Sequence, residues 1–292
     1  MQIAVFGRSF TESRAPVIQE LYFLLHQSGV QVQILEPFFK ASQSLMPIGA
    51  KFSKFKNQDD LDNRTSCMIT IGGDGTLLES VTLIRNTEIP LVGINTGRLG
   101  FLTSYSQDEI AKAVEAALNQ SYLLEKRSVL QLKMNGGPFA DFPYALNDIT
   151  LHKKESSTMI TVHARLNGEH LNSYWADGLI VASPTGSTGY SLSCGGPILM
   201  PESPSFVITP IAPHNLNVRP LVITDEHSLS IDVEVRGKNF LLALDSRSAS
   251  IPAKTEITIN KASFSIRLAR KPEQPFLKTL REKLMWGIDR RN

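Results

Sequence analysis

The sequence predicts an α/β domain followed by an all-β domain. Its length of 292 residues is enough for two domains of ordinary size. The first third alternates strand-like apolar runs with helix-like runs, whereas short β-rich segments parted by turn residues extend from about Tyr122 to about Arg270. We therefore expect an N-terminal α/β domain at 1–121, a β-rich domain at 122–270 and a C-terminal helix at 271–292 that packs back on the first domain.

The first domain is predicted from the order of its elements. Pro16 near the start and Gly29 at the end predict its first helix, and Asp108 and Glu109 favour the start of its last one. The predicted strands are 3–6, 32–35, 67–71 and 90–94, and the predicted helices are 16–27, 77–85 and 106–118. Such alternation is typical of a mostly parallel sheet covered on both faces. Residues 40–60 are expected to form an irregular, mobile insert.

The second domain is predicted from alternating strands and from turn residues. Strands are expected at 129–134, 161–166, 230–235 and 255–259. Asn135-Gly136 and Asn167-Gly168 each follow an alternating run, which is the pattern of a β-hairpin turn. These features predict a layered all-β domain. Residues 275–286 then regain a helical pattern.

Composition narrows the class of protein. The net charge of +2 gives no reason to expect a nucleic-acid partner, and we find no run of about eighteen uncharged apolar residues. The N-terminus lacks the layout of a signal peptide. Cys67 and Cys194 lie far apart and fit no metal-binding spacing. These observations favour a cytoplasmic enzyme with reduced thiols and no membrane partner.

The most informative motif is Gly72-Gly73-Asp74-Gly75-Thr76, which lies between a predicted strand and a predicted helix. Glycines allow a sharp turn, and the amides of such a turn and of the helix N-terminus attract phosphates. The carboxylate of Asp74 would not help to bind an anion, so it suggests a proton acceptor or a metal ligand beside the phosphates. The alternative is an ordinary turn in which the aspartate caps the helix.

A second polar run makes the first more specific. A short apolar strand ends in small hydroxyl residues and glycines over 177–190, and 191–197 continues the pattern. Such a run offers many hydroxyl and amide groups to a ligand with several oxygens. A Ser/Thr-rich surface loop is the alternative, and the apolar flanks and the glycines argue against it.

With these motifs the sequence resembles the NAD kinases. The matching blocks are 72–76, 93–102, 177–197 and 209–214, in the expected order over nearly the whole chain. The first block alone also resembles diacylglycerol kinases, sphingosine kinases and phosphofructokinases, whereas the third is highly specific. The resemblance implies a Rossmann-like N-terminal domain, a β-sandwich-like C-terminal domain and an active site between them.

The resemblance also implies the reaction. NAD kinases phosphorylate the adenosine-ribose 2′-hydroxyl of NAD with ATP and so produce NADP and ADP. Family members use a divalent metal ion, usually Mg²⁺, and are typically homodimers or homotetramers. Asp74 matches the catalytic aspartate that is the proposed base for the 2′-hydroxyl.

The remaining site residues follow by position in the motifs. The positions that match NAD-binding residues are Asp74, Gly75, Asn147, Asp148, Asp177, Thr188, Gly189, Tyr190, Ser193, Ala212 and Arg247. Asp148 stands where the family usually has glutamate, so it reaches less far toward the ribose hydroxyls. Asp177 matches the contact to the nicotinamide end, and the residues from 188 to 193 match the adenine-side pocket. His214 is expected to be a structural hydrogen-bonding residue.

Two departures from the family remain open. Asp245-Ser246-Arg247 replaces a frequent Asp-Gly-Gln. Arg247 could contact a ligand phosphate or a surface carboxylate, and we give these two alternatives about equal weight. Glu79 stands where some relatives carry a basic residue for the ATP phosphates. Arg85 and Arg98 are the candidate substitutes.

Two other functions share some of these features. A lipid kinase would share the glycine turn, but no amphipathic anchoring helix stands out in the sequence. A non-catalytic NAD-binding sensor could lose the carboxylate at position 74, and the presence of Asp74 argues for catalysis.

Overall fold

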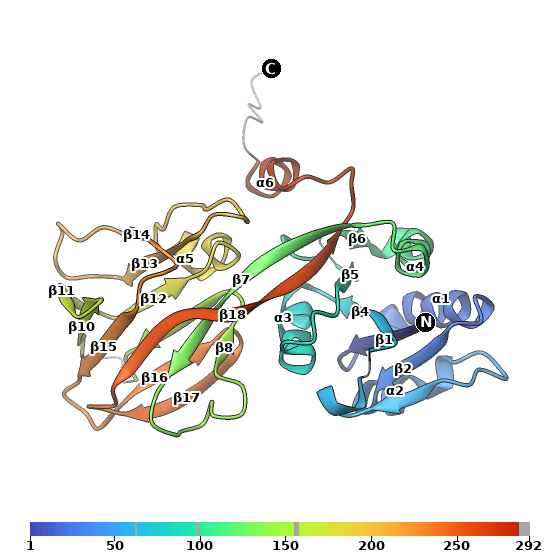
Figure 1. Cartoon of the computed structure of the whole chain (residues 1–292), viewed down its shortest axis with the longest axis horizontal. Helices are drawn as coiled ribbons and strands as arrows, with labels where there is room; N and C mark the ends of the chain where they lie inside the picture. Colours follow the sequence, from blue (N-terminus) through green and yellow to red (C-terminus); the bar gives the residue numbers. More distant parts are fainter. Residues whose placement is uncertain (62, 98–99, 155–157, 286–292) are drawn as a thin grey trace, which may run out of the picture. The chain divides into compact units, whose positions relative to one another are not determined.

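The chain folds into two compact units. The computed structural model describes residues 1–61, 63–97, 100–154 and 158–285. The first unit contains Met1–Glu125 and Ile266–Asn292, and the second contains Lys126–Ser265. The chain enters the second unit along strand β7 (Leu123–Lys133) and returns along strand β18 (Ile257–Arg270) (Figure 1).

A parallel sheet forms the centre of the first unit. Its strands follow the order β3-β2-β1-β4-β5, and β6 and the end of β18 also pair with β5 in parallel. The bounds are β1 Gln2–Gly7, β2 Gln31–Leu35, β3 Ser53–Phe55, β4 Thr65–Gly72, β5 Leu91–Asn95 and β6 Tyr105–Ser106. Because parallel strands need crossover connections, helices lie between most of them.

Helices cover both faces of this sheet, as the sequence predicts. They are α1 Ala15–Gln27, α2 Glu36–Ser42, α3 Asp74–Ile84 and α4 Ile110–Asn119, and α6 Phe276–Leu284 follows near the chain end. Helices α1 and α4 share one core with alternate residues of β5, Val92 and Ile94 among them. The intervening Gly93 points to the other face, where a Cβ would lie 3.0 Å from the side chain of Leu77 in α3.

The expectation of an irregular insert at 40–60 is wrong. Helix α2 continues to Ser42, a short 3-10 helix covers Gln43–Leu45, and β3 pairs with β2 in parallel. Phe38 and Phe55 are almost completely buried and anchor the segment in the core. Pro47 and Gly49 lie in the loop between the 3-10 helix and β3.

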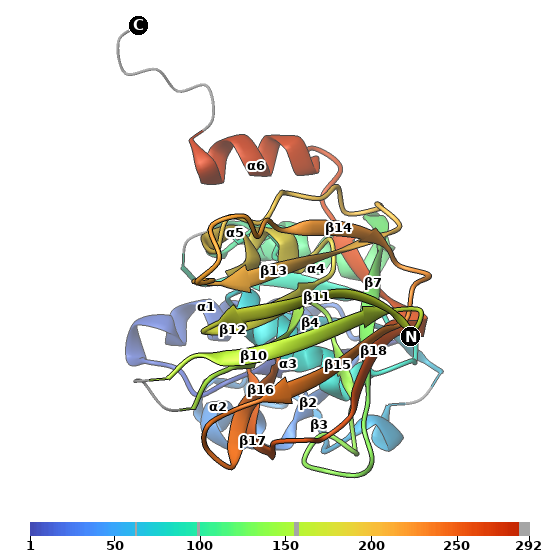
Figure 2. The same cartoon turned by 90° about the vertical axis from the view of Figure 1, so that its left-hand side faces the viewer.

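The second unit consists of two sheets. One has the antiparallel order β14-β13-β12-β9-β16-β17. In the other, β11, β10, β15 and β18 run side by side (Figure 2). Strand β7 pairs with β18, and β8 pairs with β7. The remaining bounds are β8 Tyr144–Ala145, β9 Asp148–His152, β10 Ile160–Leu166, β11 Glu169–Ala176, β12 Gly178–Ala182, β13 Ser205–Ile211, β14 Leu221–Thr224, β15 Leu229–Glu234, β16 Asn239–Leu244 and β17 Arg247–Pro252.

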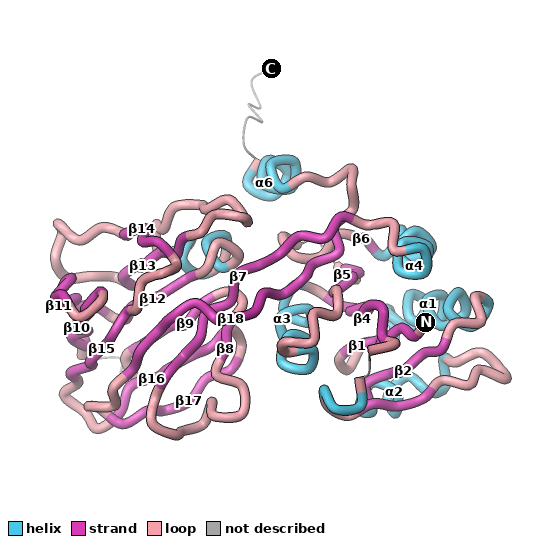
Figure 3. Tube along the Cα trace, in the orientation of Figure 1, coloured by secondary structure: helices cyan, strands magenta, loops and turns pink. Residues whose placement is uncertain are grey.

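Apolar residues from both sheets form one core, which confirms the predicted sheet-rich second domain. Leu151 of β9, Val162 of β10 and Ile231 of β15 are among its members. The other face of β12 carries a smaller apolar cluster beside the short helix α5 (Tyr190–Ser193). Figure 3 shows the contrast between this strand-dominated unit and the alternating elements of the first.

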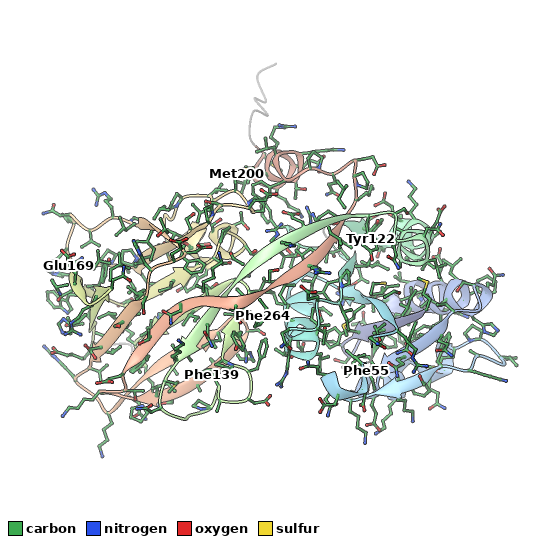
Figure 4. The ribbon with its side chains drawn as sticks, in the orientation of Figure 1. Phe55, Tyr122, Phe139, Glu169, Met200 and Phe264 are labelled. Atoms are coloured by element: carbon green, nitrogen blue, oxygen red, sulfur yellow. The ribbon has the colours of Figure 1, made fainter. Side chains whose placement is uncertain are left out.

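Only one of the two expected tight hairpins forms. Asn167 and Gly168 both have positive φ, at 52° and 88°, and they join β10 to β11 as predicted. At the other site β7 pairs with β8 only across a longer connection, residues 134–143. Phe139 lies in that connection and is buried in the core of the unit (Figure 4). The longer connection therefore carries an aromatic core residue, which a two-residue turn would not.

The C-terminal helix has the predicted type. It covers Phe276–Leu284, and Trp286 of the predicted helix lies outside the described residues. In the part of the chain that the structure describes, we find no helix whose length and apolar character would let it cross a membrane.

Candidate active site

The glycine motif forms the predicted strand–turn–helix. Strand β4 ends at Gly72, Gly73 is the N-cap residue in an extended conformation, and α3 begins at Asp74. Gly72 has φ of +154°, and a Cβ there would lie 2.3 Å from Oγ1 of Thr76. The motif therefore requires glycine at position 72 for both its backbone conformation and its space.

Asp74 does not cap its own helix in this structure; its carboxylate binds the loop that follows β5. Oδ2 accepts hydrogen bonds from the backbone N–H groups of Phe101 at 2.7 Å and Leu102 at 3.2 Å. Oδ1 accepts from the backbone N–H of Thr103 at 3.1 Å and from its hydroxyl at 3.0 Å. These donors orient both carboxylate oxygens, which is the geometry of a positioned group rather than of a solvated side chain.

The local sequence explains why this loop can reach Asp74. A Cβ on Gly100 would lie 1.9 Å from Oδ1 of Asp74, so only glycine allows the chain to pass there. The Thr103 hydroxyl accepts hydrogen bonds from Nδ2 of Asn95 at 2.9 Å and from the N–H of Gly100 at 3.2 Å. Asn95, Gly100 and the residues from Phe101 to Thr103 therefore hold Asp74 in place.

The basic residues beside the turn differ from those that the sequence suggested. Arg85 ends α3, at the opposite end of that helix from Asp74, and Arg98 lies outside the described residues. Arg8 follows β1 directly and forms an ion pair with Glu79. Arg8 also lines a small hollow together with Gly72 and other residues of this region. Since β1 and β4 are parallel neighbours, the position of Arg8 after its strand was the signal that could have found it.

In the second unit, one end of the sheet gathers several of the predicted residues. Asp148 opens β9 opposite Ala182 at the end of β12, and Ile149 lies opposite Leu244 at the end of β16. The residues just outside these strand ends, Asn147 and Asp245 among them, are therefore neighbours although they are distant in sequence.

Asp245 holds the segment that carries Asn147 and Asp148. Its carboxylate accepts hydrogen bonds from the backbone N–H groups of Leu146 at 2.8 Å, Asn147 at 2.7 Å and Asp148 at 3.2 Å. Asp245 has φ of +53°, a conformation that aspartate tolerates better than most residues do. The Asp245-Ser246-Arg247 block, which departs from the frequent family pattern, thus has a structural role that sequence reasoning missed.

The polar run after β12 packs directly on Asn147. The N–H of Ser183 donates to the carbonyl of Asn147 at 2.9 Å, and the Ser183 hydroxyl donates to the carbonyl of Leu146 at 2.5 Å. A Cβ on Gly186 would lie 2.1 Å from the Asn147 carbonyl oxygen, so glycine is required there. Arg127, which sequence reasoning also missed, is buried and donates to the hydroxyl of Thr185 at 3.3 Å.

Burial raises the pKa values of two carboxyl groups at this end of the sheet, those of Asp148 and Asp245. Asp148 is nearly buried, and burial raises its pKa to about 6, with a further contribution from the negative charge of Asp245. A hydrogen bond of 2.8 Å from the Thr150 hydroxyl opposes the shift. Burial also raises the pKa of Asp245, against the opposing effect of its three backbone donors.

Asp177 and Ala212 lie at the other end of the same strands. Asp177 precedes Gly178, which pairs with Ile211, and the N–H of Asp177 donates to the Ile211 carbonyl at 3.0 Å. Lys153 binds its carboxylate at 2.6 Å. Ala212 is exposed with φ of +42°.

Helix α5 and the turn before it carry four more of the predicted residues. Burial raises the pKa of Tyr190, and the negative charges of Asp148 and Asp177 add to that shift. Tyr190 is still 44% exposed, and Ser193 is exposed as well. Thr188 and Gly189 lead into this helix and are partly exposed. The polar strip, as we call it, consists of the predicted residues at the two ends of β12 together with those of α5 and of the turn before it.

The guanidinium of Arg247 contacts two backbone carbonyls and an aromatic ring of the second unit. Its Nη1 donates to the carbonyl of Phe142 at 2.7 Å, its Nη2 donates to the carbonyl of Tyr144, and its guanidinium lies 5.1 Å from the centre of the Phe142 ring. His214 packs against Trp175 with ring centres 4.1 Å apart, and its backbone N–H donates to the Trp175 carbonyl.

The fold and the site together define a two-domain nucleotide-binding protein of the phosphotransferase type. A glycine turn at a helix N-terminus lies in the α/β unit beside a positioned carboxylate, and the sheet-rich unit gathers polar residues at both ends of β12. The model of the ATP-NAD kinase N-terminal domain matches residues 12–122, and that of the C-terminal domain matches 146–271. The chain belongs to the NAD kinase family, whose members are phosphotransferases that act on an alcohol group.

Relatives cover the whole chain. The NAD kinases of Flavobacterium psychrophilum and Cytophaga hutchinsonii are 48% and 45% identical, with full coverage of both chains in each case. The crystal structure of an Archaeoglobus fulgidus NAD kinase in complex with ATP has a TM-score of 0.76 at 26% identity and covers 98% of this chain and 99% of that one. Yeast NADH kinase complexed with NADH shares the fold, with a TM-score of 0.88 at 24% identity and coverage of 99% and 88%.

Proposed function

We propose that this chain transfers the γ-phosphoryl group of ATP to the adenosine-ribose 2′-hydroxyl of NAD, with Asp74 as the general base. The observation that carries the proposal is the carboxylate of Asp74, fixed beside the N-terminus of α3 by donors from Phe101 to Thr103. The amides at a helix N-terminus favour phosphate groups, and a fixed carboxylate among them can accept a proton.

The proposed step balances as an in-line displacement. The 2′-oxygen of NAD forms a bond to the γ-phosphorus, and the bond from that phosphorus to the oxygen of the departing ADP breaks. The hydroxyl proton passes to Asp74. Because the carboxylate accepts hydrogen bonds on both oxygens, it is held in one orientation, in which it would meet the hydroxyl.

A divalent metal ion, with Mg²⁺ the expected one, fits this site as a companion of ATP. The described residues contain no group of three or more His, Cys, Asp or Glu side chains placed to hold a metal. Mg²⁺ usually keeps several waters and is bound by one or two carboxylates together with substrate phosphates. Bound in this way, it would neutralise charge on the phosphates, and Asp74, at the N-terminus of α3, is the carboxylate that would help to hold it.

The NAD contacts are proposed along the polar strip of the second unit. Asn147 and Asp148 would bind ribose hydroxyls at one end of β9 and β12, Tyr190 and the residues before it would line the adenine side, and Asp177 would contact the nicotinamide end. The five residues of β12 separate the two ends by roughly 13 Å at a rise of about 3.3 Å per residue. An extended ligand suits such a strip better than a compact one.

A coupled assay tests the activity. Purified protein is given NAD, ATP and Mg²⁺, and NADP is followed with an NADP-dependent dehydrogenase. We expect NADP formation in the wild type and a loss of about 10²–10⁴-fold in turnover for Asp74→Asn, with NAD binding preserved in calorimetry. Normal turnover in that variant would remove Asp74 from the base role, and phosphorylation of diacylglycerol instead of NAD would favour a lipid kinase.

The subsites have their own test. Asn147→Ala and Asp177→Ala should each raise the KM for NAD with little change in the KM for ATP, because each removes contacts worth roughly 0.5–3 kcal/mol. A selective effect on ATP would reverse the assignment. We also propose a homodimer or homotetramer in the cytoplasm, as in the family, and light scattering of the purified protein tests its oligomeric state.

A further inference from the structure

Arg270 is a buried cation close to the proposed base. It ends β18 and is 4% exposed. Its Nη1 donates to the backbone carbonyls of Phe101 at 3.0 Å and Leu102 at 3.1 Å, and its Nε lies 3.2 Å from Oε2 of Glu125. All of these residues belong to the first unit.

The two carbonyls belong to peptide groups whose other side binds Asp74. The peptide that carries the Phe101 carbonyl also carries the Leu102 N–H, which donates to Oδ2 of Asp74 at 3.2 Å. The peptide that carries the Leu102 carbonyl also carries the Thr103 N–H, which donates to Oδ1 at 3.1 Å. In a trans peptide the C=O and N–H point in opposite directions, so each peptide bridges the guanidinium to one carboxylate oxygen.

Charge reinforces this arrangement. A cation on the carbonyl side polarises each peptide and strengthens its N–H as a donor to the anion on the other side. Burial lowers the pKa of Arg270, and the negative charges of Glu125 and Asp74 oppose that shift. Leu102 and Thr103 are themselves buried, so water has little access to compete for these peptides.

We infer that Arg270 is a positioning residue for Asp74, which it orients through the peptide groups of Phe101–Leu102 and Leu102–Thr103. The inference rests on the proposed role of Asp74 as the base. It assigns Arg270 no contact with substrate. It predicts that loss of the guanidinium reduces turnover through Asp74 and leaves substrate binding nearly intact.

Arg270→Met tests the inference, because methionine fills much of the same space without a donor. We expect kcat to fall by roughly 10–100-fold, with the KM values for NAD and ATP within about 3-fold of wild type. Arg270→Lys, which keeps a charged donor, should recover part of kcat. Arg267→Met is the matched control, since Arg267 lies on the same strand and pairs with Glu88 at 2.7 Å, and we expect wild-type kcat.

A double-mutant cycle separates positioning from structural damage. If Arg270 acts through Asp74, adding Arg270→Met to Asp74→Asn should cause little further loss of kcat. Amide hydrogen exchange at Leu102 and Thr103 should be faster in Arg270→Met than in the control. Equal losses from Arg270→Met in the wild-type and the Asp74→Asn backgrounds would overturn the inference, as would unchanged kcat in a folded Arg270→Met variant.

Misfolding of Arg270→Met, failure of the base role of Asp74 and failure of the positioning role of Arg270 give different results. Arg270→Met could fail to fold because it leaves the charge of Glu125 without the Arg270 guanidinium. In that case the double variant Glu125→Gln/Arg270→Met takes the place of Arg270→Met in the cycle, with the same expected changes in kcat and KM. If Asp74→Asn keeps wild-type turnover, the proposed base role fails. If Asp74→Asn loses turnover and the Arg270 variants do not, only the positioning role fails.

Discussion

Oδ1 of Asp245 accepts a hydrogen bond of 2.7 Å from the backbone N–H of Asn147, which lies 98 residues earlier in the chain. The same carboxylate also binds the amides of Leu146 and Asp148. Asn147 and Asp148, the residues proposed to contact the ribose, are therefore positioned by a carboxylate from the turn between β16 and β17.

Asp245→Asn should weaken NAD binding more than it weakens ATP binding. Asparagine tolerates the positive φ of this position but presents one acceptor oxygen instead of two, so amides of the 146–148 segment lose an acceptor. We expect the KM for NAD to rise about 10-fold or more, with a smaller change for ATP. Ser246→Ala, at an exposed neighbour, is the control. Equal effects on both substrates would contradict a local positioning role.

Gly100→Ala should reduce turnover strongly, whereas Gly97→Ala should not. A Cβ at position 100 would lie 1.9 Å from Oδ1 of Asp74 and must displace the carboxylate or the loop. At Gly97 the nearest neighbour within reach of a Cβ is Oδ1 of Asn95, at an ordinary 3.6 Å. We expect kcat to fall about 100-fold or more in the first variant and by less than about 3-fold in the second. Similar kinetics in the two variants would show that the loop does not hold Asp74 during turnover.

Asp148 should make stability depend on pH. Burial raises its pKa from an ordinary 3.8 to about 6, so the folded state holds this proton more tightly than the unfolded chain does. Stability from this proton is fully present below about pH 3.8 and declines as the pH rises to about 6. The total is on the order of 3 kcal/mol.

Asp148→Asn removes that titration. We expect the variant to gain stability relative to wild type between about pH 4.5 and about pH 7.5, as measured by urea unfolding at both values. Glu256→Gln, at an exposed position of the same unit, should give no such change. A constant difference between Asp148→Asn and wild type across this range would show that Asp148 does not titrate there.

Arg247→Gln should destabilise the second unit. The guanidinium donates to the carbonyls of Phe142 and Tyr144 and lies over the Phe142 ring, and glutamine cannot reproduce both contacts. We expect a loss of about 1–2 kcal/mol, or roughly 3–8 °C in Tm. Exposed Arg236→Gln is the control.

The same variant tests the sequence-based hypothesis for Arg247. If this guanidinium also binds the 2′-phosphate of the product, inhibition by NADP or NADPH weakens while NAD affinity stays almost unchanged. Lower stability with unchanged product inhibition would assign Arg247 to the fold alone.

The sequence by itself determined the features that depend on neighbours in the chain. Residue periodicity predicted α1, α4 and most strands of the parallel sheet, and the run from Gly72 to Thr76 predicted the turn before α3. It failed at β3, because a three-residue strand is defined by its pairing with β2 rather than by its own pattern.

Tertiary structure decided what holds the site residues in place. Asp74 is oriented by Phe101 to Thr103 and, behind them, by Arg270, while Asn147 is held by Asp245. No local pattern records these contacts, because they depend on which strand ends meet once the sheets have paired. Local sequence therefore specified the chemical groups of the site, and long-range pairing specified their orientation.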